Sequence, residues 1–263
     1  SPVLDALAAE GLRFAHVTAA SPWTLPSHAS MLTGLYPNHH GVRTHETRLS
    51  SSVVTVAEEF KARGFETFAV VNTHNVGGEQ FQLLQGFDEG DWRYIDETRK
   101  DTAALELRTI NSGDNVVLTA KEMLRGRDES KPFFLFLHFY DVHTDFTPKE
   151  EYRELFVQPY AGRLTGRTTQ LFDVRKNEER LAEADVRWLE EMYEAEIRQL
   201  DELLGRFFGW LDEEDIGEEM AYIKLNDKVQ VAYHDDKPIT VTLPSSVILA
   251  VTEAEPGAKG NTV

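Results

Sequence analysis

The most hydrophobic stretch of the sequence runs from 132 to 140 and reads Pro-Phe-Phe-Leu-Phe-Leu-His-Phe-Tyr. Successive side chains of a strand point to opposite faces of a sheet, so a run with almost no polar position fits a strand that is buried on both faces. We therefore expect a central strand here. Asp141, Val142 and His143 follow it directly, at the end of the strand where open α/β sheets bind their ligands.

Helix and strand patterns alternate along the rest of the first 213 residues. The expected helices cover 1–11, 53–63, 115–126 and 184–213, and the further strands cover 12–18 and 65–71. Residues 149–183 are polar and are expected to form an insertion loop with a short helix. This order predicts an α/β fold, a parallel sheet with helices on both faces.

One segment, 21–34, enters a helical pattern from a run of small and β-branched residues and reads Ser-Pro-Trp-Thr-Leu-Pro-Ser-His-Ala-Ser-Met-Leu-Thr-Gly. Thr24 is therefore expected at a helix N-terminus. Backbone N–H groups and the helix dipole favour an oxyanion or a metal-bound alkoxide there. The alternative is that Thr24 is only a cap or loop hydroxyl.

The order Pro-Ser-x-Ala-Ser-x-Leu-Thr-Gly at 26–34, followed by Leu-Tyr-Pro at 35–37 and His-Gly-Val at 40–42, resembles the signature of the sulfatases of the alkaline phosphatase superfamily. That family has Cys or Ser, oxidised to formylglycine, where this chain has Thr24, and Arg where it has His28. The Cβ methyl of Thr would permit only a ketone. The resemblance therefore implies that Thr24 attacks directly and binds a divalent metal that lowers the pKa of its hydroxyl.

Two further histidines match the same family. His74 follows the expected strand 65–71, where sulfatases read Gly-Lys-Trp-His, although Asn72 replaces the Lys. His143 matches the His of Asp-Pro-His-x-Pro. The resemblance implies that His28, His74 and His143 contact the transferred group, and that His143 contacts ester oxygens or protonates the leaving group. A plain loop histidine is the alternative for His74, and His138 is expected to be a core or supporting residue.

The resemblance also implies calcium, magnesium or zinc as the cofactor, held partly by acidic residues. Sulfatases have a strand ending in paired aspartates before the helix at 1–11 and an Asp-His-Gly after the helix at 184–213. Neither is present in this sequence. We therefore expect this chain to bind the metal poorly and to hydrolyse a small sulfate or phosphate ester slowly or not at all.

A different pattern begins near residue 214. Val229 and Val231 alternate with polar residues, as do Ile239 and Val241, which predicts a hairpin, and 247–251 offers a third strand. This order, ending in Glu-Ala-Glu-Pro-Gly-Ala-Lys-Gly at 253–260, resembles the end of domain II of elongation factor P, an OB-type barrel. Three strands cannot close such a barrel, so an exposed sheet edge is expected unless another surface covers it.

We therefore predict two incomplete domains, a sulfatase-like hydrolase domain at 1–213 and an elongation-factor-P-like β segment at 214–263. The junction suggests a fused or chimaeric reading frame or a fragment, with a natural fusion as the alternative. A second functional hypothesis is a translation-factor relative that binds RNA or the ribosome, and a third is a non-catalytic fragment.

Charge and composition narrow these hypotheses. A net charge of −18 argues against general binding to nucleic acid or anionic membranes, because phosphate contacts need Lys and Arg. The sequence has no cysteine, which excludes disulfides and thiolate chemistry but leaves the compartment open. It has no apolar run of about 18 residues and no signal-peptide pattern.

Overall fold

The computed structural model describes residues 1–10, 17–88, 92–94, 112–216, 220–225, 228–232, 238–242 and 246–252. The chain divides into two compact units. The first comprises 1–15 and 140–210, and the second comprises 16–139 and 211–263. The predicted domain boundary after residue 213 stays a prediction, because this division is by compactness and not by family.

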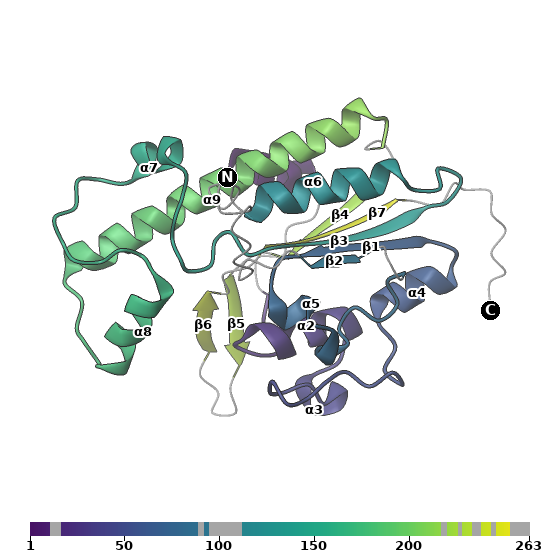
Figure 1. The fold of residues 1–263 in the computed structure, drawn as a ribbon, viewed down its shortest axis with the longest axis horizontal. Helices are drawn as coiled ribbons and strands as arrows, with labels where there is room; N and C mark the ends of the chain where they lie inside the picture. The colour runs from purple at the N-terminus through teal and green to yellow at the C-terminus, as the bar shows by residue number, and fades with distance from the viewer. Residues whose placement is uncertain are drawn as a thin grey trace, which may run out of the picture. The chain divides into compact units, whose positions relative to one another are not determined.

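The second unit is built on a five-stranded sheet of order β2-β1-β3-β7-β4 (Figure 1). Its strands are β1 (Glu66–Val71), β2 (Trp92–Tyr94), β3 (Phe133–Phe139), β4 (Met220–Leu225) and β7 (Ser246–Thr252). The pairs β1–β2 and β1–β3 are parallel, and Ala69 lies opposite Phe136 in the second. Every residue of β3 is buried. The predicted central apolar strand and a small parallel sheet of β2, β1 and β3 are therefore confirmed, whereas β7 pairs antiparallel with β3 and with β4.

Helices cover both faces of this sheet. In Figure 1, α6 (Ser112–Arg125) lies on one face and α4 (Val56–Ala62) on the other. The shorter elements of the unit are α2 (Thr24–Thr33), α3 (Pro37–His40), α5 (His74–Gly77) and the 3-10 helix η1 (Glu79–Phe81). Phe60 of α4 stacks on Phe134 of β3 with ring centroids 4.6 Å apart. A core of buried Leu, Ala, Val and Phe side chains from α2, α4, β1 and β3 holds this layer together.

The start of α4 shows how local sequence determines a boundary. Thr55 caps the helix through a capping box, in which its hydroxyl accepts from Glu58 N and the Glu58 carboxylate accepts from Thr55 N. The Thr55 hydroxyl also donates to the carbonyl of Gln85. Side-chain oxygens at this position satisfy N–H groups that the first helical turn leaves unpaired. The helix predicted for 53–63 therefore begins three residues later than expected.

The C-terminal hairpin is also confirmed, but its third strand is not where we expected it. In the pair β5 (Lys228–Ala232) and β6 (Pro238–Thr242), Val229 lies opposite Val241 and Val231 opposite Ile239. Strand β7 pairs antiparallel with β3 and β4 instead of with the hairpin. An unpaired edge of a core strand accepts a further strand readily. The described strands therefore do not confirm the predicted OB-type arrangement.

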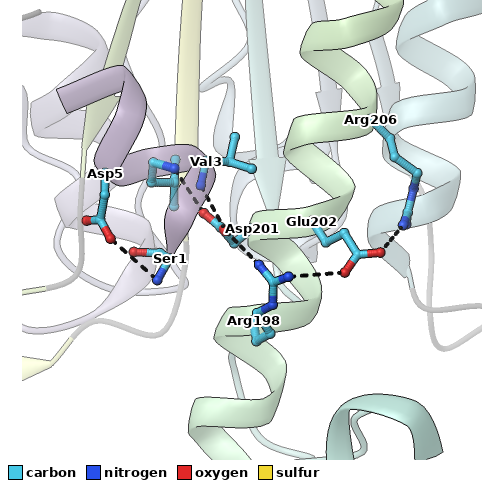
Figure 2. Close-up of polar contacts among 8 residues, drawn as sticks. Ser1, Val3, Asp5, Arg198, Asp201, Glu202 and Arg206 are labelled. Carbon is cyan, nitrogen blue, oxygen red and sulfur yellow. Dashed lines mark hydrogen bonds and ion pairs between the residues drawn. The ribbon is translucent and has the colours of Figure 1, made fainter. Parts of the chain in front are cut away.

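The first unit is helical. It contains α1 (Pro2–Glu10), α7 (Glu150–Phe156), α8 (Thr168–Lys176) and most of α9 (Glu183–Glu213). The buried Asp201 of α9 accepts hydrogen bonds from Val3 N at 3.1 Å and Leu4 N at 3.0 Å, and it pairs with Arg198 at 3.3 Å (Figure 2). A carboxylate at the first turn of a helix satisfies its unpaired N–H groups. Asp201 therefore attaches α1 to α9.

The helices predicted for 1–11 and 184–213 correspond to α1 and α9. The polar segment 149–183 contains two short helices, α7 and α8, where one was expected. Val174 of α8 packs with Leu164 and with Trp188 and Met192 of α9 in a small core. Most of the strand predicted for 12–18 lies outside the described residues. None of the described helices is long and apolar enough to cross a bilayer.

Candidate functional site

Thr24 is the first residue of α2, as the sequence predicted. The preceding residue, Trp23, is extended, with φ −145° and ψ 161°, so the chain turns into the helix at this point. Pro26 stands in the first turn, where its missing N–H costs no helical hydrogen bond. The helix ends after ten residues at Gly34, which has a left-handed φ of 70°. Thr24 is half-buried.

His28 lies one turn further along α2 and is 3% exposed. Its Nδ1 donates to the carbonyl oxygen of Thr24 at 2.8 Å. Its Nε2 is buried and has no hydrogen-bond partner among the described residues. Burial lowers the pKa of His28 to about 4, and the hydrogen bond to Thr24 opposes this only in part. His28 is therefore neutral at pH 7 and supports the backbone of Thr24.

A second buried histidine lies against the first. The ring of His138 in β3 meets that of His28 edge to face, with centroids 5.0 Å apart. His138 Nδ1 donates to Asn72 Oδ1 at 3.0 Å, and both residues are buried. Asn72 follows the carboxyl end of β1. These contacts connect the first turn of α2 to the sheet edge, and they agree with the expected core position of His138.

His74 is exposed at the start of α5, which packs against α2. Gln80 Nε2 donates to its Nε2 at 2.6 Å, and its ring meets Phe81 edge to face at 5.6 Å. Because the amide nitrogen can only donate, His74 Nε2 accepts and the proton of the neutral ring lies on Nδ1. The fold thus brings His74 into the same unit as Thr24, on a neighbouring helix.

His45 is a residue that sequence reasoning missed. Its ring lies 5.0 Å from that of Trp23, the residue before Thr24. Its Nε2 lies 3.1 Å from Asn75 Oδ1, and its ring is 6.1 Å from Phe81. His45 therefore borders both α2 and α5. The only available signal was its place three residues after the His-Gly-Val of the signature, which does not reveal a spatial neighbour.

The second half of the signature has a structural role. His40 is buried, with Nε2 lying 3.0 Å from the hydroxyl of Ser30 and Nδ1 accepting from Val42 N at 3.0 Å. Gly41 has a φ of 79°, a conformation that glycine adopts without the penalty of a Cβ. These residues fasten α3 to α2. The motif therefore supports the helix that begins at Thr24.

His143 belongs to the first unit and is half-buried. Its ring stacks on Tyr140 with centroids 4.2 Å apart. Its Nδ1 donates to the carbonyl of Thr144 at 2.8 Å, and Nε2 takes no part in this hydrogen bond. Burial lowers the pKa of His143, while the Thr144 hydrogen bond and the charge of Asp145 oppose the shift. Its predicted convergence with Thr24 and His74, which lie in the other unit, stays a prediction.

The family resemblance implied a divalent metal with Thr24 as a ligand, and poor binding was expected for this chain. Across the described residues, no group of three or more His, Cys, Asp or Glu side chains is placed to share a metal ion. A divalent ion bound by protein takes several ligands. Of the predicted ligand set the described chain offers only Thr24. The Nδ1 atom of the neighbouring His28 already donates a hydrogen bond to the carbonyl oxygen of Thr24.

Comparison with known proteins shows the family. Residues 1–227 match the sulfatase family, so the chain belongs to the sulfatases and contains a sulfatase-family hydrolase domain, within the alkaline phosphatase superfamily. That family typically uses a divalent metal. The match extends beyond the domain boundary predicted after residue 213.

Among curated proteins, the chain is 24% identical over 180 residues to the uncharacterized sulfatase YidJ of Escherichia coli, covering 60% of this chain and 36% of that protein. It is 24% identical over 161 residues to the N-acetylglucosamine-6-O-sulfatase of Bacteroides thetaiotaomicron, covering 59% of this chain and 28% of that protein. The chain thus spans about a third of the length of these relatives.

A separate similarity supports the second resemblance. Over 49 residues the chain is 53% identical to elongation factor P of Thermosipho africanus, which covers 19% of this chain and 26% of that protein. This is a partial match to the translation factor.

The solved structures agree on the fold. The phosphonate monoester hydrolase of Agrobacterium radiobacter superposes with a TM-score of 0.68 at 16% identity, covering 95% of this chain and 62% of that one. A protein in complex with its substrate D-glucosamine-2-N,6-O-disulfate superposes with a TM-score of 0.64 at 16% identity, covering 94% of this chain and 65% of that one. The α/β sheet and its helices are therefore those of the sulfatase fold.

Proposed function

We propose that residues 1–213 form a domain that hydrolyses sulfate or phosphate esters, with Thr24 as the nucleophile. The main support is the position of Thr24. It is the first residue of α2, within the signature sequence, and its carbonyl is held by His28. The unpaired N–H groups and the dipole at this helix end favour negative charge on a hydroxyl or an ester oxygen.

The histidines would then have different roles. His28 is buried, so we assign it to holding the first turn of α2, in place of the predicted contact with the transferred group. His74 is exposed on the neighbouring helix α5 and is proposed to contact the ester oxygens. His143 would act on the leaving oxygen. Burial lowers the pKa of His143, so its protonated ring is a stronger acid than a free imidazolium but is also less populated.

The turnover of this chain is expected to be slow. A threonine hydroxyl is a weak nucleophile at neutral pH unless a base or a metal activates it. Within the described ranges, no three His, Cys, Asp or Glu side chains are grouped so that they could share a metal ion. We therefore propose that weak binding of calcium, magnesium or zinc limits the rate of hydrolysis. If the chain binds no metal at all, it would be a non-catalytic fragment.

The substrate class follows from chemistry and from the relatives. A helix N-terminus and imidazole N–H groups suit a tetrahedral oxyanion of either sulfur or phosphorus. One solved structure of this fold holds a glucosamine disulfate as its substrate, and another relative is a phosphonate monoester hydrolase. A small sulfate or phosphate ester, including a sulfated sugar, is therefore the proposed substrate.

The test is hydrolysis of p-nitrophenyl phosphate and p-nitrophenyl sulfate with added calcium, magnesium or zinc. We expect slow turnover that is lost in Thr24→Ala and kept in the control Thr33→Ala, at the other end of the same helix. Equal turnover in wild type and Thr24→Ala would reject the nucleophile. Fast metal-dependent turnover that Thr24→Ala abolishes would reject the expected weak activity.

A second candidate function rests on the elongation-factor-P-like segment and its β5–β6 hairpin. Binding to ribosomes or RNA would give salt-sensitive co-sedimentation with ribosomes. The net charge of −18 opposes it, so we expect the chain to stay in the supernatant at low salt.

A further inference from the structure

Two side chains of α9 hold the backbone of the segment that follows His143. Glu196 Oε1 accepts from Thr147 N at 2.6 Å, and Gln199 Oε1 accepts from Lys149 N at 2.8 Å. The two side chains are 2% and 3% exposed. Residues three apart lie on the same face of a helix, so one face of α9 carries both acceptors. Both contacts lie within the first unit.

The same segment is held on its other side near His143. Thr168 at the start of α8 donates from its hydroxyl to that of Thr144 at 2.8 Å, and its N–H donates to Asp145. Phe146 N donates to the carbonyl of Gly166 at 3.1 Å. The backbone from 144 to 149 thus has partners along most of its length. His143 directly precedes this segment, and its ring stacks on Tyr140.

We propose that Glu196 and Gln199 are positioning residues for His143: by holding the backbone of residues 147–149 they determine the place and burial of its imidazole. This rests on the proposed function, in which His143 acts on the leaving oxygen. Thr147 lies four positions after His143, so a shift at Thr147 moves the turn that carries the ring. Neither residue touches the reacting atoms.

The chemistry of Glu196 fits this role. Its Oε2 is buried without a hydrogen-bond partner in the described ranges, and a buried unpaired charge is costly. Burial, with the charges of Asp141 and Asp145 adding to it, raises the pKa of Glu196 to about 9, although the Thr147 hydrogen bond acts in the opposite direction. A neutral carboxyl group still accepts through its carbonyl oxygen. A glutamine should therefore replace it, and a leucine should not.

The experiment is NMR on the whole chain, because it reads geometry without depending on turnover. In wild type we expect the amides of Thr147 and Lys149 to be protected from hydrogen exchange. In Glu196→Leu we expect the Thr147 amide to exchange about tenfold faster, the factor for losing one hydrogen bond of about 1.4 kcal/mol. We also expect the depressed pKa of His143 to rise toward that of a free imidazole, since its burial is lost.

Three comparisons make the result decisive. Glu196→Gln should restore both readouts, and Glu190→Leu, an exposed carboxylate on the same helix, should change neither. If Glu196→Leu does not fold, Gln199→Ala and the exchange rates of the wild-type amides carry the test. An unchanged His143 pKa in the folded leucine variant, or unprotected amides in wild type, would overturn the proposal. If the His143 pKa rises as expected but turnover does not depend on Thr24, the proposed function is rejected and the positioning role of Glu196 and Gln199 stands.

Discussion

The Nδ1 atom of His28 donates a 2.8 Å hydrogen bond to the carbonyl oxygen of Thr24, one helical turn before it. This contact lies in the first turn of α2 and continues through the ring of His138 to Asn72 at the end of β1. In the family pattern an arginine stands where this chain has His28. Here a neutral, buried ring occupies the position, and it stabilises backbone instead of presenting a charge.

Replacing His28 with leucine is therefore expected to destabilise the protein. The variant keeps apolar packing but loses the donor to Thr24 and the edge-to-face contact with His138. We expect a loss of about 1–2 kcal/mol in the free energy of unfolding, the usual size for a lost buried hydrogen bond. Urea unfolding measures it. His39→Leu on α3, where the side chain is exposed, is the control, and an equal loss in both variants would contradict the interpretation.

Glu196 is expected to produce a pH dependence of stability. Its pKa is raised to about 9 in the folded state, from an ordinary value of 4.5. Between these two pH values the folded state therefore binds more protons than the unfolded state, so this group destabilises the protein as pH rises. The slope is at most about 1.4 kcal/mol per pH unit. Asp141 and Asp145 are the charged groups that add to the shift.

The measurement is the difference in unfolding free energy between wild type and Glu196→Gln at pH 5 and pH 8. Subtracting the variant removes the contributions of all other carboxylates, provided that they are unchanged. We expect the glutamine variant to gain stability relative to wild type at the higher pH. A difference that does not vary with pH would show that Glu196 is ionised in the folded protein.

Asp201 is expected to be one of the most important polar residues for stability. Its carboxylate is fully buried and accepts from two N–H groups of α1 while it pairs with Arg198 (Figure 2). Asp201→Ala should cost about 2–3 kcal/mol, because it leaves both N–H groups and the guanidinium without this partner. Thermal or urea unfolding tests this. Glu202→Ala, whose half-exposed carboxylate pairs with Arg198 and Arg206, should cost less than about 1 kcal/mol.

Gly86 is expected to tolerate no side chain. Its φ is 92°, and a Cβ there would lie 2.5 Å from Glu58 N and 2.9 Å from the hydroxyl of Thr55. Gly86→Ala would therefore strain the backbone and displace the capping box of α4, at a cost of about 2 kcal/mol or more. Gly126→Ala is the control, because a Cβ there meets no atom closer than 3.6 Å. Equal unfolding midpoints for the two variants would contradict this account.

Sequence reasoning was reliable where a single element carries its own signal. The apolar run that became β3 contains seven consecutive buried residues, and a helix-period pattern marked α9. The N-terminal position of Thr24 followed from the change of pattern around it. In each case the periodicity of one segment determines its conformation and the face that it buries.

The two largest departures come from contacts between distant segments. Strand β7 reads as part of a C-terminal barrel, but its backbone pairs with β3, more than a hundred residues earlier. The hydrogen bonds between strands join backbone groups that every sequence offers, so any strand of suitable length can pair with an open sheet edge. His45 likewise becomes a neighbour of Trp23 only because the chain folds back between them.

The sequence by itself determined the α/β class, the family signature and the start of a helix at Thr24, because these depend on local periodicity and on residue types in order. The tertiary structure alone decided that His28 is buried and neutral and that Glu196 and Gln199 hold the segment after His143. Burial and the partners of a side chain depend on which segments pack together, and local pattern does not encode that.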